Sequence, residues 1–184
     1  MLVKHRLELR FQRAHVQEPI TCEMTRRFNS VMFNIDHLTV GVQSATMRLA
    51  LVGKAVDVKA AKDYLKSLNV SLKVLSSGRC KDEFPDVPMR MFTEKSDQPT
   101  VERKLWLTFL GTQKRRPFLW EISRRFDVTF KITQSSTGAE VAIMSLVLWG
   151  APAEVDAVVA YLREQGINVE FGQASLAMPF GPDE

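Results

Sequence analysis

Residues 31–53 read VMFNIDHLTVGVQSATMRLALVG, and residues 128–150 follow the same pattern with VTFKITQSSTGAEVAIMSLVLWG. In both stretches apolar and polar residues alternate on either side of a polar connection that contains Gly41 or Gly138. Such alternation is typical of two strands joined by a short turn. The shared positions are Phe33/Phe130, Ile35/Ile132, Gly41/Gly138, Met47/Met144, Leu49/Leu146, Leu51/Leu148 and Gly53/Gly150. We therefore expect the chain to contain one small unit twice.

The segments around the two stretches also correspond. A shorter alternating segment precedes each stretch, and a proline that suits the first turn of a helix lies between them. The predicted elements are strands at 6–13 and 105–110, helices at 19–28 and 117–126, helices at 55–68 and 151–165, and strands at 70–74 and 167–171. The order βαββαβ predicts an α+β fold of two tandem ferredoxin-like units. Each unit should have a four-stranded antiparallel sheet with two helices on one face.

These elements divide the chain into four parts. We expect the first unit at residues 1–76, a linker at 77–100, the second unit at 101–173 and a tail at 174–184. The linker contains three prolines and mixed charges, but it is too apolar for a free tether, so we expect it to pack on one of the units. We expect the tail to be loose.

The composition argues against several classes of protein. The 184 residues include only two cysteines, Cys22 and Cys80, at unmatched places in the duplication, which does not support a disulfide framework or a metal cluster. No segment approaches the roughly 20 apolar residues of a membrane span, and the first residues lack the apolar core of a signal peptide, so we expect a soluble, cytoplasmic protein. The net charge of +4 is concentrated in the first unit. This indicates an anionic partner there, although a solvated basic surface is the more common cause.

Motifs for catalysis or cofactor binding are absent from the sequence. The three histidines, His5, His15 and His37, lack metal-ligand spacing, and there is no glycine-rich phosphate loop and no nucleophile in a recognisable setting. We therefore expect a protein that is not an enzyme and that has no cofactor and no metal. The βαββαβ order also occurs in an RNA-binding module, but the strand at 46–53 lacks its basic–glycine–aromatic signature. RNA binding is the weaker alternative, and we expect no nucleic-acid partner.

Helices on one side of each sheet leave the other side open. The alternation sends Asn34 of the first unit to this open face. In the second unit the same face collects Trp106, Ile143, Val147 and Trp149, which are too apolar to be left to water. We expect this face to be covered, either by the linker or the first unit, or by another subunit, since aromatic residues are favoured at interface cores.

Most of the chain outside the linker and tail resembles the NIL domain. That domain is the ferredoxin-like module at the C-terminus of the ATPase subunit of bacterial methionine importers. The segments that carry the resemblance are RRFN at 26–29, NI at 34–35 and MRLALVG at 47–53, with RRFD at 124–127, KI at 131–132 and the strand that ends at Gly150 in the second copy. The resemblance implies a regulatory module that binds methionine, here without any ATPase motif.

The resemblance also implies where a ligand would bind. The family's ligand-binding asparagine corresponds to Asn34, and we expect Ile35 and Asp36 to belong to the same site. Asp36 stands where the family prefers an apolar residue, and the second copy has Lys131 in place of the asparagine. Lys131 has two interpretations, as a partner for a ligand carboxylate or as a solvated strand residue.

Two functional hypotheses follow. The leading one is a non-enzymatic regulatory protein that binds a small amino acid, such as methionine, and acts on a transporter or another regulatory partner. The competing one is an interaction module without a small ligand, whose covered sheet faces serve assembly. In both, we expect the two units to pair within the chain or the chain to form a homo-oligomer, and a ligand would shift this packing.

Overall fold

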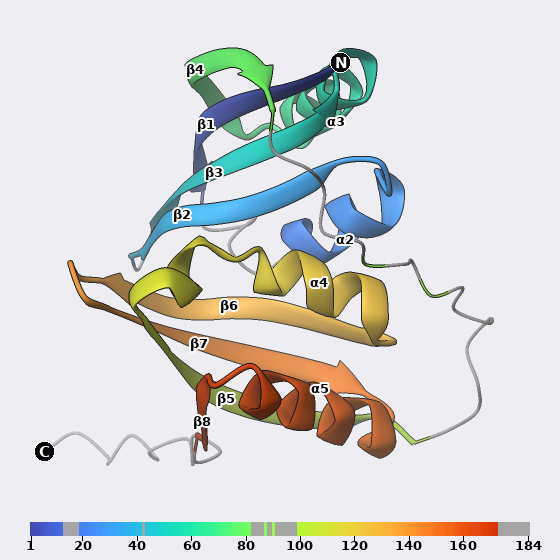
Figure 1. Ribbon diagram of the computed structural model, residues 1–184, viewed down its shortest axis with the longest axis vertical. Coiled ribbons are helices and arrows are strands. Elements are labelled where there is room, and N and C mark those ends of the chain that lie inside the picture. Colours follow the sequence, from blue (N-terminus) through green and yellow to red (C-terminus); the bar gives the residue numbers. More distant parts are fainter. Residues whose placement is uncertain (13–18, 42, 82–86, 88–89, 91–98, 173–184) are drawn as a thin grey trace, which may run out of the picture.

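Both predicted units are present in the computed structural model, which describes residues 1–12, 19–41, 43–81, 87, 90 and 99–172 (Figure 1). The first unit consists of β1 (Leu2–Gln12), α2 (Ile20–Arg27), β2 (Met32–Val40), β3 (Ser44–Lys54), α3 (Ala55–Ser67) and β4 (Ser71–Cys80). The second consists of β5 (Val101–Leu110), the 3-10 helix η1 (Gly111–Arg115), α4 (Phe118–Arg125), β6 (Val128–Thr137), β7 (Val141–Gly150), α5 (Pro152–Glu164) and β8 (Asn168–Phe171). The predicted α+β fold of tandem βαββαβ units is confirmed.

Each unit has one four-stranded antiparallel sheet with the same strand order. The orders are β2-β3-β1-β4 and β6-β7-β5-β8. Equivalent residues pair at the sheet centres, where Leu7 lies opposite Leu49 and Leu105 lies opposite Leu146. All four leucines are buried in the hydrophobic core, as the alternation predicts for the helix-covered face.

The glycines that end the two duplicated stretches have the same packing role. A Cβ atom on Gly53 would lie 2.9 Å from the carbonyl oxygen of Ser30, and one on Gly150 would lie 3.0 Å from a methyl carbon of Val128. Any side chain at either position would therefore push the strand away from the start of its neighbour. This close approach explains why both copies have glycine here.

The last strand of the first unit is longer than predicted. Strand β4 extends to Cys80, which lies opposite Leu2, so the first unit continues past the boundary predicted at residue 76. The equivalent strand of the second unit, β8, ends at Phe171. The predicted tail, residues 174–184, lies outside the described residues.

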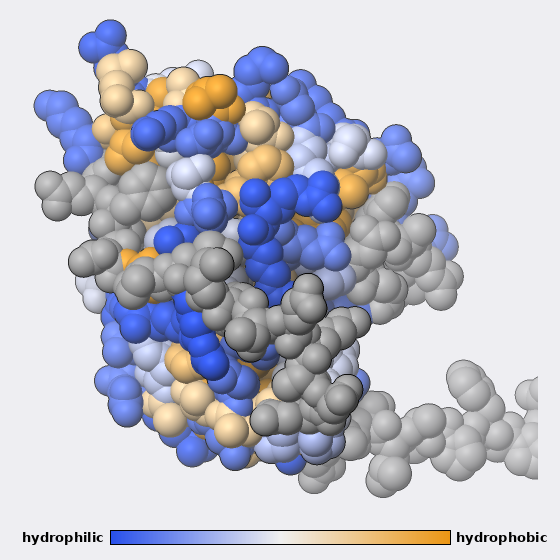
Figure 2. Space-filling model, turned by 90° about the vertical axis from the view of Figure 1, so that its right-hand side faces the viewer, coloured by the Kyte–Doolittle hydropathy of each residue, from blue (hydrophilic) through white to orange (hydrophobic). Residues whose placement is uncertain are grey.

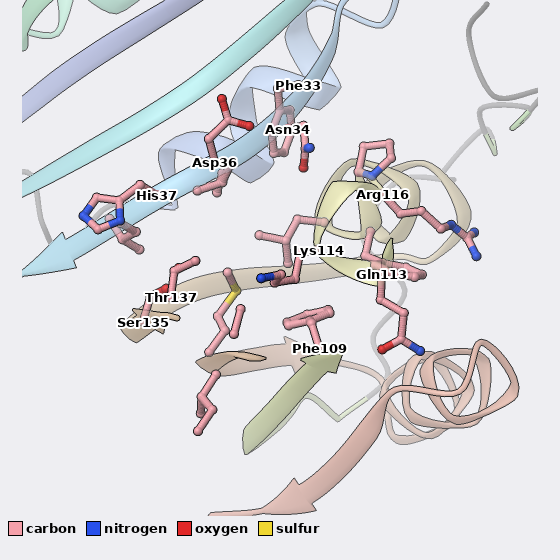
Figure 3. Close-up of a pocket in the computed structure, with 18 residues that line it drawn as sticks. Phe33, Asn34, Asp36, His37, Phe109, Gln113, Lys114, Arg116, Ser135 and Thr137 are labelled. Carbon is pink, nitrogen blue, oxygen red and sulfur yellow. The ribbon is translucent and has the colours of Figure 1, made fainter. Parts of the chain in front are cut away.

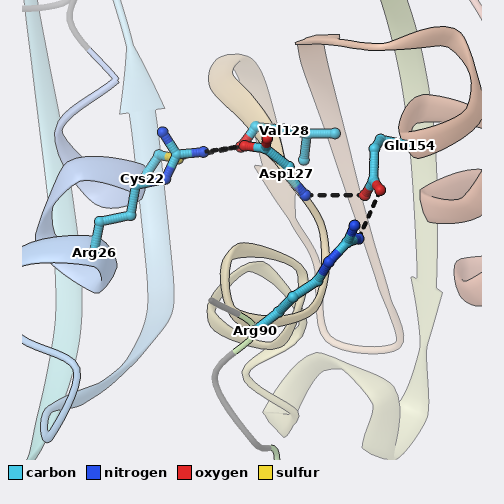
Figure 4. A network of polar contacts seen from close by, with 6 residues as sticks. All are labelled: Cys22, Arg26, Arg90, Asp127, Val128 and Glu154. Carbon is cyan, nitrogen blue, oxygen red and sulfur yellow. Dashed lines mark hydrogen bonds and ion pairs between the residues drawn. The ribbon is translucent and has the colours of Figure 1, made fainter. Parts of the chain in front are cut away.

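Two residues of the predicted linker, Val87 and Arg90, contact the second unit. Val87 is buried, and its carbonyl oxygen accepts a 2.9 Å hydrogen bond from Nε of Arg124. The Arg90 amide donates to the Arg124 carbonyl oxygen at 2.9 Å, and its guanidinium lies 2.6 Å from the carboxylate of Glu154 (Figure 4). These contacts attach the linker to α4 and α5.

The two units meet along equivalent elements. Strand β2 lies beside β6 and helix α2 lies beside α4, while the two sheets remain separate (Figure 1). Side chains at equivalent positions of the two helices reach the other unit. Trp120 Nε1 donates to the Val31 carbonyl oxygen at 3.1 Å, and Cys22 Sγ donates to the Val128 carbonyl oxygen at 3.6 Å. The units therefore pair with an approximate twofold relation.

One turn after Cys22 and Trp120, each helix has an arginine that also reaches the other unit. Arg26 Nη2 donates to the Val128 carbonyl oxygen at 2.8 Å (Figure 4), and Arg124 Nη1 donates to the Asn29 carbonyl oxygen at 2.6 Å. Arg26 also lies 3.8 Å from the Asp127 carboxylate. On the face shown in Figure 2, hydrophilic residues lie across the middle of the view, between more hydrophobic areas above and below. Polar contacts thus frame the junction on the side where the helices end.

The open face of the second sheet is partly exposed. Trp106, Val147 and Trp149 are half-buried, and Ile143 is 41% exposed. Trp149 Nε1 donates to the Glu102 carboxylate at 2.7 Å. The first unit meets the second mainly through β6 and α4. Coverage of this face by the linker, the first unit or another subunit stays a prediction.

Among the described residues, no helix combines the length and the apolar character needed to cross a membrane.

Candidate ligand-binding site between the units

A cavity of about 60 Å³ lies between the two units, where β2 faces η1 and the start of α4 (Figure 3). The first unit contributes six consecutive residues, 33–38. The second unit contributes Phe109, Gln113, Lys114, Arg116, Pro117, Phe118, Leu119, Ser135, Thr137, Ala142, Ile143 and Met144. Neither unit could form this cavity alone.

A bulge in β2 explains why consecutive strand residues line one cavity. The pairing of β2 with β3 shifts between Ile35 and His37, which leaves Asp36 as an extra residue. A bulge bends a strand and redirects its side chains, and bulges are common beside functional sites. Strand β6 has the same irregularity between Ile132 and Gln134. The duplication therefore preserved a local distortion as well as the core.

Asn34 connects the two units at the cavity. It is half-buried on β2, and its Nδ2 donates a 3.1 Å hydrogen bond to the carbonyl oxygen of Arg115 in the second unit. The sequence predicts this residue on the open face of the first sheet. Because β2 is the edge strand, the same position also lies at the junction of the units.

Arg116 is a cation held in a fixed position at the cavity. Its guanidinium donates to Gln165 Oε1 at 2.6 Å and to Glu121 Oε2 at 3.0 Å. The same group lies 4.4 Å from the ring centroid of Phe118, which is within the range of a cation–π contact. The Arg116 side chain is 45% exposed, and its guanidinium points away from Asn34 and Lys114 (Figure 3).

Asp36 lines the cavity, but its carboxylate points away from η1, toward the first sheet (Figure 3). Partial burial raises the pKa of its carboxyl above the ordinary value, and the nearby Arg6 and Lys4 counteract this in part. The Arg6 guanidinium lies 3.7 Å from the Asp36 carboxylate. A desolvated carboxylate gains most from an additional cationic partner.

Other polar side chains at the cavity hold the fold together. Gln113 Oε1 accepts a hydrogen bond from the Leu110 amide at 2.9 Å, and its Nε2 donates to the Gly166 carbonyl oxygen at 3.0 Å. Lys114 Nζ donates to the Gly138 carbonyl oxygen at 3.0 Å. These bonds fix η1 against the neighbouring loops, and so position Arg116.

The structure brings together three of the four residues predicted to bind a ligand. Asn34, Ile35 and Asp36 line the cavity, whereas Lys131 lines a separate pocket beside α2. Ile143, predicted at an interface, also lines the cavity. The roles of these residues in binding stay predictions.

Sequence reasoning missed the contribution of the second unit. Gln113, Arg116 and Phe118 belong to the polar loop and helix start around Pro117, far from Asn34 in the chain. The duplicated prolines predict a helix at this place, but they do not indicate that it faces β2 of the other unit. That proximity follows only from the pairing of the units.

The cavity is equipped for non-covalent binding. Its lining combines the polar residues Asn34, Asp36 and Arg116 with apolar walls, a mixture typical of sites that orient small ligands. Within the part of the chain that the structure describes, no three His, Cys, Asp or Glu residues are grouped so that they could hold a metal ion.

Comparison with known proteins identifies related sequences. The NIL domain model matches residues 5–74 and 103–171, which is one match for each unit. The methionine import ATP-binding protein MetN of Myxococcus xanthus (strain DK1622) is 28% identical over 125 residues. That match covers 59% of this chain and 38% of the relative, so the chain spans well under half of the relative's length.

Solved structures with low sequence identity also align with the chain. A protein of unknown function from Galdieria sulphuraria is 11% identical, with 95% of this chain and 99% of that chain covered and a TM-score of 0.33. Aminoacylhistidine dipeptidase from Vibrio alginolyticus is 7% identical, with 94% of this chain and 40% of that chain covered and a TM-score of 0.38.

Proposed function

Because the chain belongs to the NIL domain family, we propose that it is a regulatory protein that binds a small amino acid, such as methionine, between its two units. The binding site in this proposal is the cavity lined by Asn34, Ile35 and Asp36. The observation that carries the proposal is that polar residues of both units, Asn34 and Asp36 on β2 and Arg116 before α4, line this one cavity together with an apolar wall.

A free amino acid matches these groups. With the side chains of Asp36 and Arg116 turned into the cavity, its ammonium would pair with the Asp36 carboxylate, and its carboxylate would accept hydrogen bonds from the Arg116 guanidinium. The amide of Asn34 can both donate to and accept from the ligand backbone. Phe118 and Met144 offer an apolar surface for the side chain, and a thioether packs well against aromatic rings.

The size of the cavity restricts the ligand. Its volume of about 60 Å³ is far below the roughly 300–1,000 Å³ of pockets for drug-sized ligands. The proposal is therefore limited to single amino acids and molecules of similar size.

Binding would strengthen the pairing of the units. Both units line the cavity, so a ligand that contacts both binds only when they are paired and shifts the population toward that state. The hydrogen bond from Asn34 to the Arg115 carbonyl oxygen crosses the same boundary and would change with it. Occupancy would thus be converted into a change in unit packing that a partner can detect.

The partner in this proposal is a component of a transporter. The relative from Myxococcus xanthus carries the name of a methionine importer's ATP-binding protein, which supports a transport-related role. Co-purification of this chain with the products of neighbouring genes, with and without methionine, would test the proposal.

A second candidate function rests on a different observation. The half-buried Trp106, Val147 and Trp149 give the second sheet an aromatic open face, which suits assembly into a homo-oligomer without any small ligand. Measuring the molar mass over a range of concentrations, with and without amino acids, separates this candidate from the leading proposal.

Calorimetry and thermal unfolding with free amino acids test the leading proposal. At a methionine concentration of 100 times Kd, the paired state should gain about 2.7 kcal/mol of stability. Asn34→Ala should weaken this response, because it removes the amide from the cavity. The matched control is Lys131→Ala, which changes the equivalent position of the second unit outside the cavity and should leave the response intact.

The decisive negative result is a wild-type protein that neither releases heat nor gains stability with any of the common amino acids. An equal response in wild type and Asn34→Ala would instead move the ligand to another site.

A further inference from the structure

We infer that a second pocket, beside α2, binds short aliphatic monocarboxylates. This pocket has a volume of about 40 Å³ and lies between the start of α2, the hairpin of β2 and β3, and strand β6. Its occupant differs from the amino acid proposed above, so the inference does not depend on that proposal.

The second pocket is the counterpart of the first through the duplication. Phe11, Pro19, Ala45, Met47 and Ile132 line it. The equivalent residues Phe109, Pro117, Ala142, Met144 and Ile35 line the first cavity. Since each position is matched, the second pocket follows from the architecture of the paired units and is not an isolated packing defect.

The two pockets differ in chemistry. Where the first cavity has Ser135 and Thr137, the second pocket has Leu38 and Val40. Where the first has Asn34, the second has Lys131. The second pocket is therefore mainly apolar, with Lys131 as the charged residue in its lining.

This combination selects an anion with an aliphatic chain. A lysine covers apolar surface with its stem and keeps its ammonium near water, where a carboxylate can approach it. The aliphatic chain would then occupy the space beside Phe11 and Met47. A zwitterion fits less well, because the residue equivalent to Asp36 is Thr133, whose hydroxyl bonds to Ser145.

Methionine methyl resonances can observe each pocket separately. Met47 lines the second pocket and Met144 lines the first, so the full chain labelled with ¹³C-methyl methionine carries a matched pair of reporters. Titration with acetate, butyrate and hexanoate should shift the Met47 resonance. Affinity should rise roughly three- to fourfold for each methylene until the pocket is full.

The charge and the volume of the second pocket can be altered by separate substitutions. Lys131→Met should weaken hexanoate binding about tenfold by removing the charge-assisted contact, whereas Lys131→Arg should retain most of it. Ala45→Ile should fill the second pocket and abolish the Met47 shift. The matched variant Ala142→Ile narrows the first cavity and should leave hexanoate binding unchanged.

Three results would overturn the inference: no shift of Met47 with hexanoate, a shift of Met144 alone, or equal affinity in wild type and Lys131→Met. Each is separate from the amino-acid proposal, which fails instead when methionine leaves the Met144 resonance unchanged.

Discussion

The two units share a core but differ at the centre of their open faces. In the first unit Glu8 is nearly buried and accepts hydrogen bonds from Arg48 Nε at 2.9 Å and from Arg10 at 3.1 Å. The positions equivalent to Glu8 and Arg48 hold Trp106 and Ser145 in the second unit. The duplication therefore kept the residues that pack strands against helices, while one exposed face became ionic and the other aromatic. Faces that differ this much are suited to different partners.

The largest expected difference between the units is in how much stability a substitution in α4 or in α2, the helices at the junction, removes. Trp120 and Cys22 are equivalent, and both are buried and donate across the junction, but tryptophan fills far more space. Trp120→Ala should lower the free energy of unfolding by about 3–5 kcal/mol, because it leaves a large cavity and removes the donor to Val31. Cys22→Ala should lower it by about 1 kcal/mol. Chemical denaturation of both variants measures the difference.

Similar losses of stability in these two variants would show that Trp120 contributes no more to the junction than Cys22. Trp120→Phe is the intermediate control, because it keeps most of the ring volume and removes only the donor.

A smaller difference in stability is expected between substitutions of Tyr161 and Tyr64, which occupy equivalent positions in the two units. The Tyr161 hydroxyl donates to Glu121, which is 2% exposed, whereas Tyr64 donates to Glu23 at 3.2 Å on the surface. Tyr161→Phe should cost about 1–2 kcal/mol, because the buried carboxylate of Glu121 loses a donor. Tyr64→Phe should cost less than about 0.5 kcal/mol. Urea unfolding of the two variants, side by side, tests this; equal costs would refute it.

The same contrast predicts a dependence on alkaline pH. Burial, and then the hydrogen bond to Glu121, raise the pKa of Tyr161 from 10.0 to about 12. Between pH 10 and about 12, Tyr161 ionises in the unfolded chain but stays neutral in the folded protein. The contribution of Tyr161 to the free energy of unfolding is therefore complete below pH 10 and is lost as the pH rises toward about 12. In Tyr64→Phe, which retains Tyr161 alone, tyrosinate absorbance should appear near pH 12. Ionisation near pH 10 in the folded protein would show that the hydroxyl is not buried in this contact.

The duplicated pattern was sufficient to predict the units. Phe33 and Phe130, with the leucines that alternate around them, set both the strand period and the buried face, and the two glycines at 53 and 150 mark a close approach that no side chain allows. Local periodicity determines these features, so a single sequence contains them. The end of β4 at Cys80 was missed because its polar, exposed residues lack such a period.

The pairing of the units could not be predicted in the same way. Arg26 and Arg124 stand at helix ends, where a cation also opposes the helix dipole, and nothing in their spacing indicates that each reaches the other unit. The cavity has the same origin, since Asn34 and Arg116 line one space only because β2 and β6 lie side by side. Contacts between distant segments leave no periodic trace in one sequence.

The smallest expected effect concerns the ionic face of the first unit. The hydrogen bonds from Arg48, and then from Arg10, lower the pKa of Glu8 below its ordinary value of 4.5. The stability that this carboxylate contributes is therefore present above that value and is lost as the pH falls through the lower pKa of the folded state. Glu8→Gln should be less stable than wild type at neutral pH, and the gap should close in acid, because wild type then loses the same interaction. Melting temperatures measured from pH 7 downward test this, with Glu164→Gln, an exposed residue at the end of α5, as the matched substitution in the second unit. A gap for Glu8→Gln that stays constant with pH would mean that the arginines do not favour the charged form, and that the two open faces differ in composition but not in electrostatics.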